Sequence, residues 1–110
     1  GVRAQTAHGH TPGHTVYVVE SKGEKLELWG DLMHVAAVQF AMPSTTIQFD
    51  TDPKAAAPQR IKNYADAASK GYYVAVAHVS FPGIGRLRAE GAGYRWMPID
   101  YSANRPPAAK

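Results

Sequence analysis

Alternation of apolar and polar residues predicts several β-strands along the chain. Residues 15–20 and 25–30 are rich in β-branched, aromatic and leucine residues, and the turn-forming segment 21–24 separates them. This pattern predicts a β-hairpin. A near-continuous apolar run predicts another strand at 72–79, ahead of a tight glycine- and proline-containing loop. Further strands are expected at 46–49, 86–90 and 94–101.

One long helix is predicted between Asp52 and Gly71. Asp52 followed by Pro53 is typical of an N-cap and first helical position, although Pro58 is expected to delay the regular part. Gly71 is a C-terminal signal. Residues 32–40 are apolar and fit neither a helical nor a strand period clearly. The helix is expected to bury one apolar stripe, formed by Ile61, Tyr64, Ala65 and Ala68.

The predicted strands carry more apolar surface than one helix can cover. Val16 and Val18 point to one face of their strand, while Tyr17 and Val19 point to the other. Strands that are apolar on both faces belong in a sheet covered on both sides. The cover on the second face is therefore expected from a missing segment, a second copy of the chain or another chain.

The composition limits the size, the class of protein and the kind of metal site that fit this chain. The 110 residues suffice for one domain, 45% are hydrophobic, and no apolar run is long enough to cross a membrane. The net charge of +3 arises in the last 25 residues, which we interpret as a solvated edge and not as a nucleic-acid site. Residues 103–110 are expected to be a disordered tail. Because cysteine is absent, any metal ion must be held by histidines and carboxylates.

Histidines gather in one turn, and further metal-binding residue types follow predicted strands. His8, His10 and His14 lie in a glycine- and proline-rich segment directly before a strand. Asp31 follows the second strand of the hairpin, and His78 lies near the end of the strand at 72–79. Imidazole and carboxylate ligands suit zinc, manganese, cobalt or iron. Taken one at a time, each histidine fits equally well as a surface or hydrogen-bonded core residue.

The segment Gly9-His10-Thr11-Pro12-Gly13-His14-Thr15, followed by Gly30-Asp31 and a distant His78, resembles the second half of the metallo-β-lactamase superfamily. The resemblance is closest to methyl parathion hydrolase-like enzymes and extends over nearly the whole chain. It implies an α/β fold, with residues 1–102 forming half of a four-layer αββα sandwich. That half would contain a mixed sheet with one main helix, and it would be incomplete without an N-terminal half.

The resemblance also implies a binuclear metal centre. His10 matches a ligand of one divalent ion, Asp31 matches the catalytic carboxylate that bridges both ions, and His78 matches a ligand of the second. His14 would support the loop behind these ligands. The ions would be zinc in the first instance, with manganese, cobalt or iron as alternatives. A metal-bridging hydroxide would hydrolyse a small-molecule phosphotriester, lactone or other ester.

The chain departs from the family pattern in one respect. The first metal motif of the superfamily, His-x-His-x-Asp-His, does not occur in it. We therefore expect a fragment that is inactive alone, with partial or no metal occupancy. Its partner would be the missing N-terminal half or a second copy in a homodimer, with no membrane or nucleic acid. A purely structural, self-associating half-sandwich is the alternative, RNA binding or processing is less favoured, and the parent is expected in the periplasm or secreted.

Other residues have more than one interpretation each. His34 lines the substrate pocket, forms a hydrogen bond near the metal ions, or is an exposed histidine without a role, and the last of these is favoured. Phe49 and Phe81 either shape an apolar substrate pocket or pack into the core, and core packing is favoured for both. Core or strand-pair positions are expected for the remaining large aromatic residues, Trp29, Tyr72, Tyr94 and Trp96.

Overall fold

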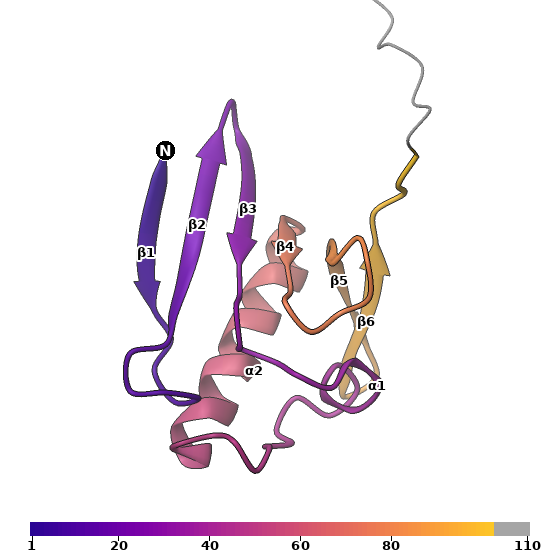
Figure 1. Ribbon diagram of the computed structural model, residues 1–110. Coiled ribbons are helices and arrows are strands. Elements are labelled where there is room, and N and C mark those ends of the chain that lie inside the picture. Colours follow the sequence, from indigo (N-terminus) through magenta and orange to yellow (C-terminus); the bar gives the residue numbers. More distant parts are fainter. Residues whose placement is uncertain (103–110) are drawn as a thin grey trace, which may run out of the picture.

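The computed structural model describes residues 1–102 and shows one mixed sheet with one long helix (Figure 1). The disordered tail predicted at 103–110 lies outside the described residues. Within them, no helix is long and apolar enough to cross a membrane. The strands are β1 (Val2–Thr6), β2 (Thr15–Ser21), β3 (Glu24–Leu28), β4 (Tyr73–Ala75), β5 (Ile84–Glu90) and β6 (Gly93–Pro98), and the helices are α1 (Ala36–Gln39) and α2 (Pro53–Lys70).

The strands lie side by side in sequence order, and all neighbours are antiparallel except β3 and β4. The β2–β3 hairpin turns on Lys22 and Gly23, both of which have positive φ angles, as a two-residue turn of this twist requires. The parallel β3–β4 pair needs a long crossover, which contains both helices. The predicted hairpin is thus confirmed, and its second strand ends at Leu28.

Helix α2 begins and ends where the sequence signals predict. The Asp52 carboxylate accepts a hydrogen bond from the Ala55 backbone nitrogen, and Pro53 is the first helical residue. Gly71 adopts a left-handed conformation with φ 69°, and its backbone N–H caps the Ala67 carbonyl. The delay expected at Pro58 does not occur, because the helix is continuous from Pro53.

The predicted buried stripe of α2 is wrong in part. Ile61 and Ala65 are exposed, whereas Tyr64 is fully buried. The face that packs on the sheet also contains polar residues, because a buried arginine reaches across to loops beyond the helix. The residues on this face are Ala56, Arg60, Asn63, Tyr64 and Ala67.

Three other predictions about strands need correction. Residues 46–49 form a turn and no strand, since the Asp50 backbone nitrogen bonds to the Ile47 carbonyl and curls the segment. The strand expected at 72–79 is confined to β4, after which the chain loops away from the sheet. Strand β1 was not predicted from its weak alternation, and it forms by pairing along β2. The apolar residues at 32–40 contain the short helix α1.

Aromatic stacking fills the core between α2 and the sheet. The Tyr64 ring stacks on Trp29 with centroids 5.2 Å apart, and Phe40 stacks on Trp96 at 5.4 Å. Such pairs each add roughly 0.5–1.5 kcal/mol beyond the burial of their area. Trp29 and Tyr72 are buried, and Tyr94 and Trp96 pack against the core, as predicted.

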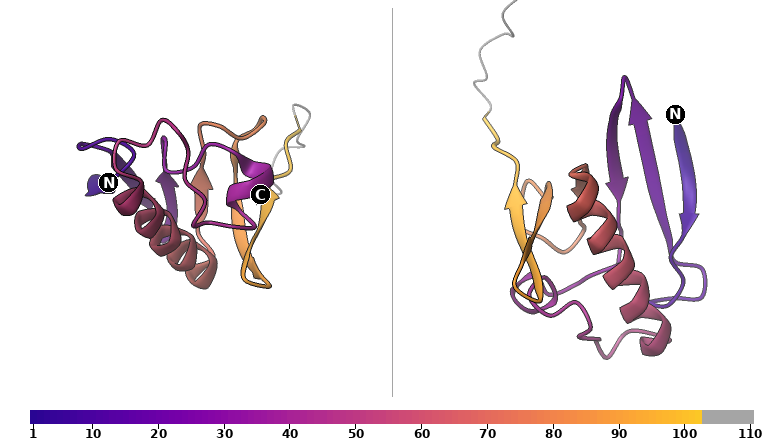
Figure 2. Two further views of the ribbon diagram at one scale, coloured as in Figure 1. Left: turned by 90° about the horizontal axis from the view of Figure 1, so that it is seen from below. Right: turned by 180° about the vertical axis from the view of Figure 1, so that it is seen from behind.

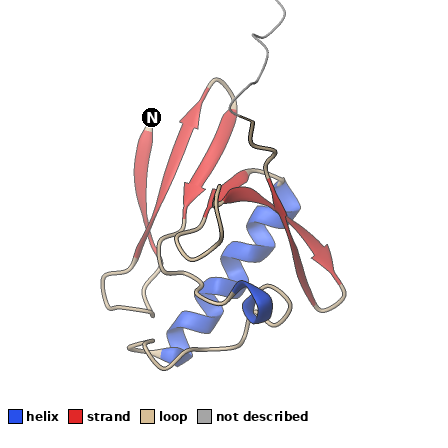
Figure 3. Ribbon diagram, turned by 45° about the vertical axis from the view of Figure 1, so that its right-hand side comes forward, coloured by secondary structure: helices blue, strands red, loops and turns tan. Residues whose placement is uncertain are grey.

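The face of the sheet away from α2 has no layer on it in the described part of the chain. Viewed from behind, α2 crosses the sheet on one side only (Figure 2), and Figure 3 shows this single long helix against the strands. A hollow of about 680 Å³ opens on the bare face beside Tyr73 and Arg86. This face, called the open face below, presents Val2, Tyr17, Val19, Leu26, Leu28, Tyr73, Ile84, Arg86 and Met97.

Gly9→Ala should lower the free energy of unfolding by about 2 kcal/mol or more. Gly9 has a φ of 151°, and a Cβ there would collide with the backbone of Ala56 in α2. Urea denaturation followed by circular dichroism measures the effect. Gly13→Ala in the same loop is the matched control, because a Cβ on Gly13 meets nothing within 4 Å. Equal stability of the two variants would contradict this close packing.

Candidate metal centre

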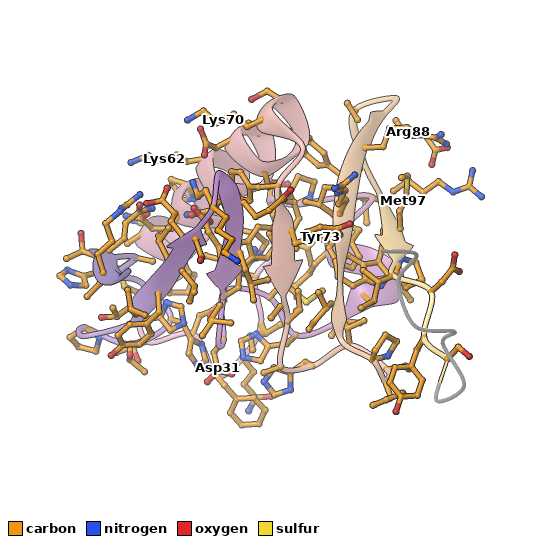
Figure 4. All side chains as sticks on the ribbon, turned by 90° about the horizontal axis from the view of Figure 1, so that it is seen from above. Asp31, Lys62, Lys70, Tyr73, Arg88 and Met97 are labelled. Carbon is orange, nitrogen blue, oxygen red and sulfur yellow. The ribbon has the colours of Figure 1, made fainter. Side chains whose placement is uncertain are left out.

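The parallel pairing of β3 and β4 brings two candidate ligands together. Leu28 and Ala75 are register partners, and Asp31 and His78 each lie three residues beyond them. His78 Nε2 is 2.7 Å from Asp31 Oδ1, a hydrogen-bond distance. Figure 4 shows Asp31 on the side of the molecule away from Lys62 and Lys70 of α2. The site therefore lies at the carboxyl ends of these strands, where loops leave the sheet.

His10 reaches Asp31 from the loop between β1 and β2. That loop is tied to the start of α2, because the Thr51 nitrogen bonds to the His10 carbonyl and the Asp52 nitrogen to the Gly9 carbonyl, each at 2.9 Å. His10 Nε2 is 3.5 Å from Asp31 Oδ2. The structure thus places His10 and His78 around the carboxylate of Asp31. Its Oδ1 faces His78 and its Oδ2 faces His10.

His34 also belongs to this group. Its side chain is only 15% exposed, so the interpretation of His34 as an exposed histidine is wrong. Its ring lies between those of His10 and His78. The centroid of the His34 ring is 4.6 Å from the centroid of each of these two rings. One ligand atom from each of His10, Asp31 and His34 lies within 4.8 Å of the other two.

Sequence reasoning missed the acid behind His10. The side chain of Asp50 is fully buried, and its Oδ1 accepts a hydrogen bond from His10 Nδ1 at 2.9 Å. This bond selects the tautomer whose Nε2 is free to bind an ion on the Asp31 side. Asp50 Oδ2 accepts from the Ile47 nitrogen and lies 3.9 Å from Arg60. No local pattern marks Asp50, since a lone aspartate near a helix start resembles any turn residue.

Arg60 fixes the loops around Asp50 from the buried face of α2. Its Nε donates to the Leu32 carbonyl at 2.8 Å, and its Nη1 donates to the carbonyls of Pro43 and Thr45. Its burial lowers the pKa of the guanidinium, although that group stays charged at neutral pH. Apolar periodicity gives no sign of this burial, because it does not mark a charged side chain as part of the buried face.

His14 links two loops of the site. Its Nδ1 donates to the Ala7 carbonyl at 3.1 Å, and its Nε2 accepts from the Asp31 backbone nitrogen at 3.0 Å. Both ring nitrogens are therefore used away from the cluster. The supporting role predicted for His14 has a geometric basis, and its effect on an ion stays a prediction.

The two phenylalanines assigned alternative roles do not enter the core. Phe49 is 79% exposed and Phe81 is 76% exposed, so core packing is wrong for both. Phe49 immediately precedes Asp50 in the sequence, and the Phe81 ring contacts Tyr101 edge-on at 4.9 Å. His8 is exposed and makes no contact with the cluster.

The electrostatics of the cluster favour an ionised Asp31 beside a neutral His34. Partial burial raises the pKa of the Asp31 carboxyl, but the hydrogen bond from His78 and the nearby histidines bring it below its usual value. Burial lowers the pKa of His34, and the neighbouring His10 and His78 lower it further. Burial also raises the pKa of Asp50, yet the bonds from Ile47 and His10 leave it lowered overall.

This donor set fits a divalent transition-metal ion. Neutral imidazoles and a carboxylate are preferred by zinc and its neighbours, and a ligand histidine backed by a buried carboxylate is common in such centres. The buried His34 Nδ1 makes no hydrogen bond within the described residues, which is costly unless another group contacts the ring. The fold and the site together define an α/β domain with a cluster of histidines and one aspartate whose donor atoms suit a metal ion.

The structure is similar to solved hydrolases. It matches AidC, a dizinc quorum-quenching lactonase in complex with a product, N-hexanoyl-L-homoserine, with a TM-score of 0.88 and 32% identity. It matches AbOPH, a hydrolase in the β-lactamase superfamily, with a TM-score of 0.88 and 40% identity. A probable metal-dependent hydrolase from Staphylococcus aureus shares the fold, with a TM-score of 0.72 and 19% identity. No family model and no curated protein matches the chain.

These matches cover most of this chain but a smaller share of each neighbour. AidC is matched over 92% of this chain and 34% of its own length, AbOPH over 93% and 35%, and the Staphylococcus aureus protein over 94% and 37%. The chain thus spans about a third of the length of these structures. The resemblance to the metallo-β-lactamase superfamily is confirmed for that part of the fold. The predicted fold class, a mixed sheet with one main helix from an αββα sandwich, is confirmed with it.

Asp50→Asn should weaken binding of zinc by roughly 10- to 100-fold while leaving the fold intact. Asparagine keeps the shape and the acceptor oxygen, but removes the negative charge that strengthens His10 as a ligand. Competition with a chromophoric chelator measures the affinity, and circular dichroism checks folding. Asp100→Asn, at an exposed position, is the matched control. If Asp50→Asn binds zinc as tightly as the wild type, Asp50 does not contribute to the site.

Proposed function

We propose that this chain is the part of a metal-dependent hydrolase that supplies one side of a binuclear centre. The observation that carries the proposal is the position of Asp31, whose Oδ1 faces His78 and whose Oδ2 faces His10. A carboxylate with a different histidine at each oxygen suits a bridge between two ions. Similarity to two hydrolases at 32% and 40% identity supports the same assignment.

The chain's residues would have distinct roles in that centre. Two bound divalent ions, zinc first among them, would supply an acidified water and polarise the bond under attack. His10, held by Asp50, would bind one ion through Nε2, and His78 would bind the other after giving up its hydrogen bond to Asp31. The ligands still needed would come from polypeptide outside these 110 residues. The chain alone would therefore lack hydrolase activity.

Small-molecule esters are the substrates we propose for the complete enzyme. A lactone is favoured, because AidC is a lactonase and its product retains an acyl chain. Phosphotriesters and other esters remain in the proposed class on the strength of the sequence resemblance. The exposed side chain of Phe49, next to the site residue Asp50, would offer apolar surface to an acyl group.

We further propose that the open face is covered by a second sheet belonging to the rest of the hydrolase. Two thirds of the length of AidC and AbOPH lies outside the match, which is ample for such a layer. Val19, Leu26 and Tyr73 form a continuous apolar row across three neighbouring strands. A second copy of this chain would cover the same row, and that arrangement is the structural alternative.

Replacing the matched segment of AbOPH by this chain tests the function. The chimera should hydrolyse whichever ester or lactone AbOPH itself hydrolyses, and Asp31→Ala should reduce kcat by at least about 1,000-fold because both ions lose a ligand. His8→Ala is the control, since His8 is exposed and outside the cluster. The isolated, zinc-loaded chain should show no turnover. A folded chimera with two bound ions and no activity would refute the proposal.

Leu26→Asp tests the cover on the open face. Leu26 is half-buried in the chain alone, so the loss of unfolding free energy should be larger in the AbOPH chimera by about 2 kcal/mol or more. Urea denaturation of both proteins measures this, with Ser21→Asp at the exposed end of β2 as control. Equal losses would show that the rest of the hydrolase does not cover this face. A concentration-dependent dimer of the isolated chain that Leu26→Asp abolishes, with equal losses in both proteins, would favour the second copy.

A further inference from the structure

His34 is a largely buried imidazole, and the structure gives neither of its ring nitrogens a hydrogen bond. Nδ1 is buried without a partner, and Nε2 approaches only Asp31 Oδ1, at 3.9 Å, which is beyond hydrogen-bond range. Buried polar groups in proteins are almost always satisfied, because an unmade bond costs about 1–3 kcal/mol. The exception here lies at the centre of a histidine cluster. Nε2, the ring nitrogen that faces Asp31, makes no hydrogen bond and is therefore free to bind a ligand.

The position of His34 is fixed by a buried glutamine. Gln39 Oε1 accepts hydrogen bonds from the backbone nitrogens of His34 and Val35, at 2.7 and 2.9 Å. Gln39 Nε2 in turn donates to the Thr45 carbonyl at 2.9 Å, next to the loop that Arg60 holds. These bonds fix the backbone from which the His34 ring projects, and such support is typical of a preorganised ligand.

The spacing of the ligand atoms distinguishes His34 from His78. Two ligands of one tetrahedral ion, each at about 2.1 Å from it, lie roughly 3.4 Å apart. Asp31 Oδ2 lies 3.5 Å from His10 Nε2, and Asp31 Oδ1 lies 3.9 Å from His34 Nε2, so each histidine is close to this separation from one carboxylate oxygen. His78 Nε2 lies 2.7 Å from Asp31, which is the length of a direct hydrogen bond, and its side chain is 44% exposed. His78 is thus placed as a partner of the carboxylate.

We propose that this chain by itself holds one divalent cation through His10, Asp31 and His34. Three protein ligands leave a fourth position for water, as in catalytic zinc sites. His78 orients Asp31 in this state and becomes a ligand only when the rest of a binuclear centre is present. The inference rests on the proposed function for His10 and Asp31, and it adds His34, which the sequence resemblance did not assign to an ion.

Titration of the purified 110-residue chain with cobalt(II), followed by visible absorption, tests the proposal. The intensity of the cobalt bands reports the coordination number and geometry of the ion, independently of any catalysis. The wild-type chain should bind one equivalent. His34→Ala should weaken binding by at least about tenfold and reduce the band intensity, and His78→Ala should weaken binding less. His34→Gln, which keeps a polar side chain of similar length, guards against a folding defect, and His8→Ala is the control.

The result that overturns the proposal is a His34→Ala or His34→Gln variant that is folded and binds cobalt as tightly as the wild type. Failure of the wild-type chain to bind cobalt overturns it as well, as does a larger loss in His78→Ala than in His34→Ala. An active AbOPH chimera combined with a cobalt site insensitive to His34 would leave the proposed function standing and remove this inference. An inactive chimera with a His34-dependent cobalt site would do the reverse.

Discussion

The candidate site depends on the parallel pairing of β3 with β4. In that pairing the carboxyl ends of both strands reach the same edge of the sheet, so that Asp31 and His78 lie equally far beyond the paired Leu28 and Ala75. An antiparallel pairing would send the two loops to opposite edges. The long crossover that a parallel pair requires also contains α2. The same constraint therefore supplies both the ligand cluster and the helix that supports it.

A buried polar network connects that helix to the cluster. Arg60 donates to backbone carbonyls of three loop residues, and it lies near Asp50, which in turn holds His10. Burying an arginine and an aspartate is costly unless nearly every polar atom is paired. Here the hydrogen bonds of Arg60 and Asp50 offset that cost. The same bonds fix loops that have no regular structure of their own. The network explains why an irregular segment can present His10 to Asp31 in a defined orientation.

The two faces of the sheet differ in burial in this chain. Val16 and Val18 are fully buried under α2, while Tyr17 is 48% exposed on the open face. A domain of this size has little apolar area to spare for stability. An uncovered apolar face and an incomplete ligand set are both accounted for if further polypeptide covers the sheet and completes the metal centre. The neighbours, which are about three times as long, are compatible with that arrangement.

The sequence by itself determined the elements whose signals are local. Asp52 and Gly71 delimit α2, and the Lys22–Gly23 turn sets the hairpin. The histidine motif predicted a metal site, which stays a prediction. The tertiary structure decided which distant groups meet. Asp50 and Arg60 carry no local signal, and β1 forms only because it pairs with β2. Hydrogen bonds between residues remote in sequence depend on the chain's path, and periodicity reports only on neighbours.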